Sequence, residues 1–171
     1  MSESERSRLY HKLVGENKGI LFKVAGTYCR DRDDIQDLIQ EISLQVWRSI
    51  EKYNSQYKAS TWLYRISINV AISFHRKNWQ RKDNTIPLTE GMEPAGEVYS
   101  ADEEQRLALL EQFISDLGKL DKALMLLYLD DKSYHEISDI LGISKTNVGT
   151  KIARIKEKLK TRFSQSKIIR T

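Results

Sequence analysis

The positions of the prolines constrain the fold of this chain more than any other feature of its sequence. Both prolines, Pro87 and Pro94, fall within residues 83–104, so no proline interrupts the long segments on either side. Those segments repeat apolar residues at helical spacing, and no alternating strand pattern runs through them. We therefore predict an all-α protein made of two small helical domains, residues 1–82 and 105–171, joined by a flexible linker over residues 83–104.

The charge of the chain changes sign along its length. Residues 1–82 carry fifteen Lys or Arg against nine Asp or Glu, and residues 105–171 carry thirteen against eight. The linker between them carries seven acids and no Lys or Arg. Two basic blocks around an acidic segment indicate two surfaces for polyanions. Two ordinary domains with a solubilising linker explain the same composition equally well.

Composition excludes several classes of protein. Hydrophobic residues make up 40% and charged residues 30%, as in soluble globular proteins. No apolar run approaches the ~20 residues of a transmembrane helix and no signal peptide is visible, so we expect a cytoplasmic protein without stable membrane insertion. With one cysteine, Cys29, and three widely separated histidines, we expect neither a disulfide nor a metal site. No nucleophile–base pair or phosphate loop is visible, so we expect no enzymatic activity and no cofactor.

Three helical stretches are predicted in the first domain. The first runs from about Ser4 to Tyr28, although its three glycines make its continuity doubtful. The second begins at Asp33, whose carboxylate can cap the first turn with Gln36 as its partner, and the third begins near Ser60. The predicted core lines are Ile35, Ile39, Ile42, Val46 and Ile50 in the second stretch, and Leu63, Ile66, Val70 and Phe74 in the third.

The second stretch carries a polar cluster that packing does not explain. Asp37, Gln40 and Glu41 occupy one side of the helix, opposite its core line. Leu44 points the same way, and Trp47 lies at the edge of the cluster. An apolar residue amid an outward polar cluster can be a docking site for another protein. Contact of Leu44 and Trp47 with a neighbouring helix of the same bundle is an equal alternative.

Aromatic residues are interleaved with lysines and arginines after this cluster. Seven of the fifteen aromatic residues fall between Trp47 and Trp79. Aromatic faces beside cations are typical of proteins that bind single-stranded nucleic acid. A place in the core is the simpler interpretation for most of them, above all for Phe74 and Tyr53.

The second domain begins with two helices and ends with a helix-turn-helix. Leu107, Leu110, Ile114 and Leu117 form the first apolar line, Gly118 ends that helix, and a short apolar helix follows around Leu120–Leu129. In residues 133–160, Ser133 and Glu136 form a capping box, Gly142 permits a sharp turn, and Ser144 can cap the last helix. The buried residues of this motif are Ile137, Ile140 and Leu141, then Val148, Ile152, Ile155 and Leu159. A plain helical hairpin is the alternative.

The outer surface of the last helix suits DNA. Small residues lie at its centre and longer polar or basic ones at its margins, as expected for a helix in the major groove. The central residues are Thr146, Thr150 and Ala153, and the marginal ones are Lys145, Asn147, Lys151, Arg154 and Lys156. Lys156, Lys158, Lys160 and Arg162 lie further along, where we expect contacts with phosphates.

Together these segments resemble the extracytoplasmic-function (ECF) subfamily of bacterial RNA polymerase sigma factors. DDIQDLIQEISLQVWRSIEKY and STWLYRISINVAISFHRK resemble sigma region 2, and the helix-turn-helix with its basic tail resembles region 4. The resemblance covers roughly residues 8–163. It implies an initiation subunit that recruits core RNA polymerase, recognises two elements of promoter DNA, helps to open the DNA and is restrained by an anti-sigma factor.

The resemblance also implies a task for particular residues. Asp37 to Glu41 match the motif that binds the clamp helices of the polymerase's largest subunit, and the polymerase-binding residues are Asp37, Gln40, Glu41 and Leu44. Asn54 to Thr61 match the loop that captures a flipped base of the minus-ten element. With the helix that follows, the minus-ten residues are Tyr57, Lys58, Ser60, Thr61, Trp62, Arg65, Asn69 and Arg76. The minus-thirty-five residues are Ser144, Lys145, Thr146, Asn147, Thr150, Lys151, Arg154 and Lys158.

Three positions depart from the patterns of these families. Trp62 is followed by Leu63, where primary sigma factors have a second tryptophan. Ser138 stands where helix-turn-helix motifs usually have alanine, and Gly149 weakens the recognition helix. The alternative function is a stand-alone helix-turn-helix regulator with an N-terminal dimerisation or ligand-binding domain. Such a regulator has no reason to carry the cluster at Asp37 to Glu41.

Overall fold

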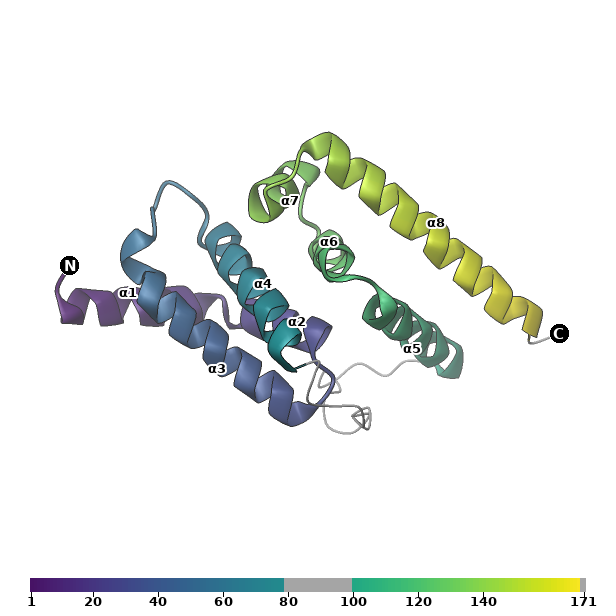
Figure 1. The fold of residues 1–171 in the computed structure, drawn as a ribbon, viewed down its shortest axis with the longest axis horizontal. Helices are drawn as coiled ribbons and strands as arrows, with labels where there is room; N and C mark the ends of the chain where they lie inside the picture. The colour runs from purple at the N-terminus through teal and green to yellow at the C-terminus, as the bar shows by residue number, and fades with distance from the viewer. Residues whose placement is uncertain (79–99, 170–171) are drawn as a thin grey trace. The chain divides into compact units, whose positions relative to one another are not determined.

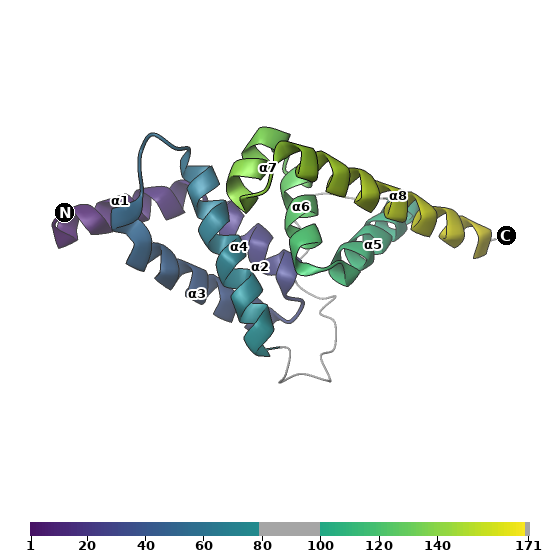
Figure 2. The same ribbon diagram turned by 45° about the horizontal axis from the view of Figure 1, so that its top comes forward.

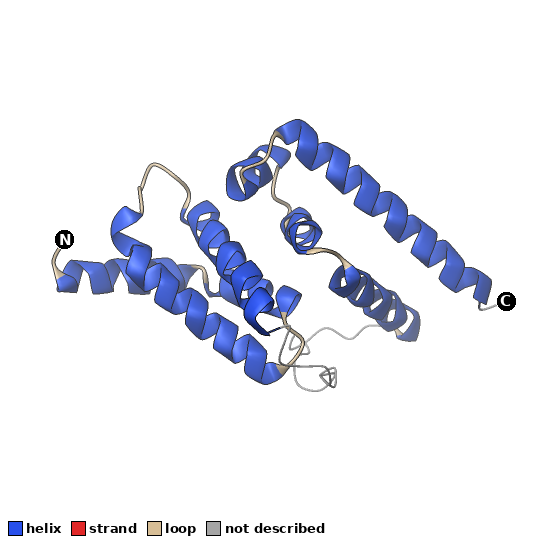
Figure 3. Ribbon diagram, in the orientation of Figure 1, coloured by secondary structure: helices blue, strands red, loops and turns tan. Residues whose placement is uncertain are grey.

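The computed structural model describes residues 1–78 and 100–169 of the chain, with the side chains of residues 1–74 and 100–166. Within these ranges all regular structure is helical (Figure 3). The chain divides into two compact units, which we describe separately. The first unit contains helices α1 to α4 and the second contains α5 to α8 (Figure 1). The prediction of an all-α fold with two helical domains is confirmed, while residues 83–99 of the predicted linker lie outside the described residues.

The first predicted stretch forms two helices rather than one. Helix α1 spans Glu3–Glu16 and α2 spans Lys18–Tyr28. Asn17 between them has φ −129° and ψ 28°, outside the helical region. Its side-chain amide donates to the carbonyl of Leu13 at 2.8 Å, which satisfies one of the last carbonyls of α1. The predicted stretch is therefore interrupted at Asn17, and its three glycines all lie inside α1 or α2.

The second stretch begins two residues earlier than predicted. Helix α3 spans Arg32–Ser49, and its N-cap is Asp31. The carboxylate of Asp31 accepts the backbone N–H of Asp33 at 3.1 Å. The predicted cap at Asp33 is wrong because Asp31 has the extended backbone of an N-cap, whereas Asp33 already lies in the first turn.

Helices α2, α3 and α4 enclose the core of the first unit (Figures 1 and 2). The short 3-10 helix η1, Ile50–Lys52, and a loop connect α3 to α4, which spans Ala59–Asn78. On α3, Leu38 is buried in place of Ile39, which is half-buried. The other predicted core residues of this stretch are buried: Ile35, Ile42 and Val46 on α3, and Ile50 at the start of η1.

The predicted core line of α4 is wrong beyond Leu63. Ile66, Val70 and Phe74 are only half-buried, and so is Tyr53 before the helix. Because α4 packs against both α2 and α3, its buried face is rotated from the predicted line toward a second set of residues. The residues buried with Leu63 are Tyr64, Ser67, Ile68 and Ala71.

The second unit begins inside the predicted linker. Helix α5 spans Ala101–Asp116, and its N-cap Ser100 forms a capping box with Glu103. Residues 101–104 are therefore helical. Leu107 is 38% exposed, whereas Phe113, which is absent from the predicted apolar line, is buried because α5 packs against both α6 and α8.

Three further helices complete the second unit. Helix α6 spans Lys119–Leu129, with Gly118 as its N-cap. The predicted interruption between the first two helices of this domain therefore falls at Leu117 and Gly118. Helix α7 spans Tyr134–Leu141 and α8 spans Lys145–Ile169. Residues 122–127 of α6 are all buried, so this short helix lies at the centre of the core.

Candidate protein and nucleic-acid interfaces

Helix α3 presents a polar surface on the side away from the core, which we call the α3 outer face and which consists of Asp37, Gln40, Glu41 and Leu44. The three polar residues are exposed, and Leu44 beside them is 42% exposed. Leu44 is not among the buried core residues of this unit, and it leaves apolar surface exposed among polar side chains. Its position favours the docking-site interpretation of Leu44.

Trp47, at the edge of this face, has different surroundings. Its indole ring packs edge-on against Tyr10 of α1, with 5.5 Å between ring centroids. The Arg6 guanidinium lies 4.6 Å from the centroid of the same ring and donates to the Trp47 carbonyl at 2.9 Å. Trp47 is therefore held by a neighbouring helix of the same bundle, as the alternative interpretation expected.

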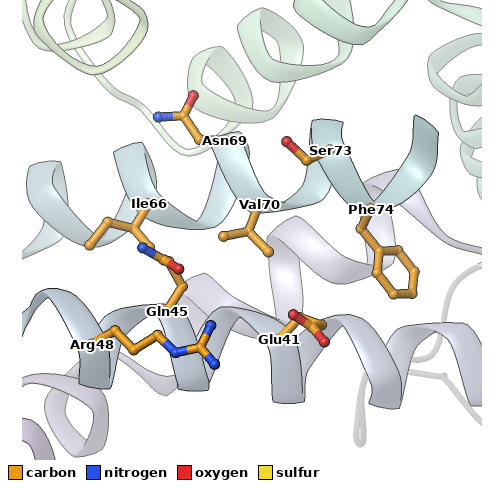
Figure 4. A pocket seen from close by; sticks show the side chains of 8 residues that line it. All are labelled: Glu41, Gln45, Arg48, Ile66, Asn69, Val70, Ser73 and Phe74. Carbon is orange, nitrogen blue, oxygen red and sulfur yellow. The ribbon is translucent and has the colours of Figure 1, made fainter. Parts of the chain in front are cut away.

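A groove runs between α3 and α4, with a volume of about 590 Å³ (Figure 4). We call it the α3–α4 groove. Its lining residues are Glu41, Gln45 and Arg48 from α3, and Ile66, Asn69, Val70, Ser73 and Phe74 from α4. The three residues wrongly predicted to lie in the core of α4 form its apolar part. The groove was not predicted from the sequence, although Glu41, Gln45 and Arg48 recur at helical spacing.

The loop between η1 and α4 is held by its own hydrogen bonds. The Asn54 side chain accepts the N–H of Gln56 at 3.0 Å, and the Asn54 carbonyl accepts the N–H of Tyr57 at 3.1 Å. The Tyr53 hydroxyl donates to the Tyr57 carbonyl at 3.3 Å. Tyr57 is 66% exposed, and Lys58 next to it is exposed. The loop therefore presents an aromatic ring beside a cation.

The residues predicted to follow this loop lie at the start and along one side of α4. Trp62 is half-buried and packs against Tyr53, with ring centroids 5.1 Å apart. Ser60 and Thr61 are half-buried, and Arg65 and Asn69 are exposed. The side chain of Arg76 lies outside the described residues. Tyr53, which the sequence analysis assigned to the core, instead supports both the loop and Trp62.

The helix-turn-helix has the predicted turn and the predicted caps at Ser133 and Ser144, and the structure shows one of the two bonds of the predicted Ser133–Glu136 capping box. The Ser133 hydroxyl accepts the N–H of Glu136 at 3.1 Å, and the Ser144 hydroxyl accepts the N–H of Asn147 at 3.1 Å. Gly142 has φ 70°, in the left-handed region that glycine adopts without steric cost. Val148, Ile152 and Ile155 are buried as predicted, and Leu159 is half-buried.

The two departures within this motif have structural counterparts. The Ser138 hydroxyl donates to the carbonyl of Ile143 at 2.5 Å, a bond across the turn that alanine cannot make. Gly149 lies beside the ring of Tyr134, and a Cβ at Gly149 would meet the ring at 3.5 Å. This is an ordinary contact distance, so Gly149 is not required for space.

The outward side of α8 is accessible over its first three turns. The small central residues Thr146, Thr150 and Ala153 are exposed, and Lys151 at the margin is half-buried. The other predicted minus-thirty-five residues, Ser144, Lys145, Asn147, Arg154 and Lys158, are exposed. A strip of short side chains flanked by cations is therefore accessible to a polyanion.

Two cations predicted to meet phosphates also contact their own unit. The Lys156 ammonium lies 4.4 Å from the centroid of the Tyr128 ring, and its hydrogen bond to the Tyr128 side chain raises the pKa of Lys156. Arg162 pairs with Asp116 at 2.8 Å and lies 5.6 Å from the centroid of the Phe113 ring. These side chains connect α8 to α6 and α5, a role that the sequence analysis did not foresee.

None of the helices in residues 1–78 and 100–169 is long and apolar enough to span a membrane. Among the side chains that the structure describes, no group of three or more His, Cys, Asp or Glu is placed to hold a metal ion.

Comparison with known proteins matches both units. The family model for sigma-70 region 2 matches residues 13–81, and that for sigma-70 region 4 matches residues 105–159. The chain is 30% identical over 138 residues to the ECF RNA polymerase sigma factor SigW of Bacillus subtilis, covering 74% of each chain. It is 29% identical over 154 residues to the ECF RNA polymerase sigma-E factor of Haemophilus influenzae, covering 82% of each chain.

The fold is also similar to a solved structure. The sigma factor RpoE of Bartonella quintana, determined in complex with the anti-sigma factor NepR, matches with a TM-score of 0.65 and 16% identity. The match covers 90% of this chain and 98% of that chain.

Proposed function

This chain belongs to the ECF family of RNA polymerase sigma factors, and we propose that its two units perform different parts of the work of a sigma factor. The protein directs promoter recognition and transcription initiation. We assign polymerase binding and the minus-ten element to the first unit, within residues 1–82. We assign the minus-thirty-five element to the second unit, which begins at α5. The linker between them holds one chain on two separated promoter elements.

The α3 outer face is the polymerase-binding surface. Glu41 and Asp37 supply charge, Gln40 supplies hydrogen bonds, and Leu44 supplies apolar area at the centre. An apolar residue surrounded by polar ones is the usual arrangement of an interface hot spot. The exposure of Leu44 is the observation that carries this assignment, because 42% of this apolar residue is left uncovered among polar side chains.

The loop before α4 is the site that receives a base from the opened minus-ten element. Tyr57 offers an exposed ring for stacking and Lys58 offers a cation for the backbone. Unstacking a base costs a few kcal/mol, and stacking on an aromatic ring recovers about 1–3 kcal/mol. Ser60 and Thr61 border the loop, and the side of α4 that carries Trp62, Arg65 and Asn69 follows the strand, with Arg76 further along.

The first turns of α8 read the minus-thirty-five element in the major groove. Thr146, Asn147 and Thr150 are short enough to let the helix backbone approach the base edges. Arg154 reaches bases from the margin. Ser144, Lys145, Lys151 and Lys158 contact phosphates, which supplies affinity that depends on salt.

We further infer that the protein acts without catalysing a reaction and that it works in the cytoplasm, where polymerase and promoter DNA are found. An anti-sigma factor is its expected regulator, since the similar RpoE of Bartonella quintana was solved with one. A stand-alone helix-turn-helix regulator is not favoured, because the first unit matches sigma-70 region 2.

Binding of core polymerase in the absence of DNA tests the assignment of the α3 outer face. Glu41→Lys reverses a charge on this face, and Leu44→Asp replaces its apolar side chain with a charged one. Neither residue is buried. We expect each to weaken binding by about 2 kcal/mol or more, with an unchanged thermal melt. Glu16→Lys, at an exposed position of α1, is the matched control and should bind as wild type does. Undiminished binding by both variants would show that this face is not the polymerase site.

A further inference from the structure

The α3–α4 groove adjoins the α3 outer face. Glu41 belongs to both, and Gln45 and Arg48 continue the lining of the groove one and two turns further along α3. On the opposite wall, Asn69 belongs to the side of α4 assigned to the minus-ten element. The groove therefore lies between the two surfaces of the first unit that the proposed function uses.

The shape of the groove fits a helix of a partner protein. Ile66, Val70 and Phe74 follow one another at four-residue spacing on α4, which places the two outer residues about 12 Å apart. All three are half-buried, so they retain apolar surface that the unit itself does not cover. Side chains at positions i, i+3 and i+7 of a partner helix span about 10 Å, which matches this length.

The charges along the groove indicate the chemistry of that helix. Figure 4 shows Arg48 at the end near Ile66, and Glu41 at the other end, between Val70 and Phe74. Asp37 lies one turn beyond Glu41 on the same helix. A phosphate backbone would be repelled at the Glu41 end, whereas a helix with one basic and one acidic side chain about two turns apart would be matched at both ends.

We propose that the polymerase-binding surface extends into the α3–α4 groove. There a helix of core polymerase inserts an apolar ridge, with a basic side chain at Glu41 and an acidic one at Arg48. This inference rests on the proposed function, because it is the shared residue Glu41 that assigns the groove to polymerase. It adds Arg48, Gln45 and the apolar residues of α4 to the surface.

A bulky residue in the groove tests this proposal. Ser73 is an exposed residue of its lining, so Ser73→Trp should occupy the groove without disturbing the core. We expect core polymerase, titrated without DNA, to bind this variant about tenfold more weakly than wild type. Ser4→Trp, at an exposed position of α1, is the matched control and should bind normally.

Charge changes at Arg48 provide a test that does not depend on how the tryptophan packs. Arg48 is exposed, so Arg48→Glu should fold normally. We expect it to weaken polymerase binding about tenfold, while Arg48→Lys retains most of the affinity. If Ser73→Trp alters the melt, the Arg48 pair decides the question alone.

The possible results separate this inference from the proposed function. Normal binding by Ser73→Trp and Arg48→Glu, with loss in Glu41→Lys, would overturn the groove proposal and leave the α3 outer face in place. Normal binding by all three would overturn both. If Ser73→Trp keeps its polymerase affinity and loses only binding to a single-stranded minus-ten oligonucleotide, the groove receives nucleic acid and the proposal is wrong.

Discussion

Ser138 of α7 donates its hydroxyl proton to the carbonyl oxygen of Ile143 across 2.5 Å, and so joins the first helix of the helix-turn-helix to the turn that precedes α8. Ile143 follows Gly142, whose left-handed backbone reverses the chain. The hydrogen bond restrains the turn from the helix side, while Ser144 caps the helix that follows. The angle between α7 and α8 is thus supported on both sides of Gly142.

We predict that Ser138→Ala destabilises the protein by about 1 kcal/mol, because the half-buried Ile143 carbonyl loses its side-chain donor. Denaturant unfolding followed by circular dichroism measures this loss. Ser164→Ala, at an exposed position of α8, is the control and should leave the midpoint unchanged. Equal midpoints for wild type and Ser138→Ala would show that the bond contributes nothing.

Tyr28 makes the stability of the first unit decrease with rising pH in the alkaline range. It is 4% exposed, and burial raises the pKa of its phenol well above the usual value of 10.0. Above about pH 10 the unfolded chain releases this proton while the folded chain keeps it, so the free energy of unfolding falls as pH rises. The slope from this one group is at most about 1.4 kcal/mol per pH unit.

We predict that Tyr28→Phe shows a smaller fall in unfolding free energy between pH 9 and 11 than wild type. The comparison is between slopes, so any change at neutral pH does not affect it. Tyr57→Phe, at an exposed position, should keep the wild-type slope. A Tyr28→Phe slope equal to that of wild type would contradict the assignment.

Two neighbouring lysines of α8 should behave differently. Lys158 is exposed, whereas Lys156 contacts Tyr128. We predict that Lys158→Ala weakens binding to all DNA sequences alike and lowers the salt slope of log K by about one, with an unchanged melt. Lys156→Ala should lower the melting temperature because α8 loses a contact with α6. If Lys158→Ala lowered the melting temperature and Lys156→Ala lowered the salt slope, the phosphate contact would belong to Lys156 and the prediction would be wrong.

The loop before α4 should matter for opening more than for initial binding. Replacing residues 56–60 with a Gly/Ser segment removes Tyr57 and Lys58, so an extruded base loses its partners. We predict that closed promoter complexes still form but that permanganate-reactive open complexes do not. Normal opening by this variant would refute the role of the loop.

Capping and turn signals made most helix boundaries of the second unit predictable. Ser133, Gly142 and Ser144 act through local backbone hydrogen bonds and backbone conformation, so their effect is readable from adjacent residues. The N-cap of α3 was wrongly predicted at Asp33 because Asp31, Asp33 and Asp34 are all possible caps, and only the backbone of Asp31 is extended.

Features that depend on distant elements were not readable from local spacing. The apolar line of α4 was misassigned because α4 packs against two helices, which leaves Ile66, Val70 and Phe74 at the groove. The contacts of Arg162 and Lys156 within their own unit were not predicted, because nothing near them in the sequence reveals Phe113 or Tyr128. The outer face of α3 was predictable because helical spacing alone places Glu41 and Leu44 opposite the core.

The most direct test of the claim that the two units read separate elements is to measure which promoter sequences the holoenzyme selects. Core polymerase would be combined with wild type, with Arg154→Ala or with Tyr57→Ala, which removes one side chain of the loop and leaves its backbone in place. Transcripts from a library randomised at both elements would then be sequenced. We predict that Arg154→Ala changes the preference at the minus-thirty-five element alone, at about 1–3 kcal/mol, and that Tyr57→Ala changes the minus-ten preference alone. Both variants altering the same element, or neither altering either, would contradict the account.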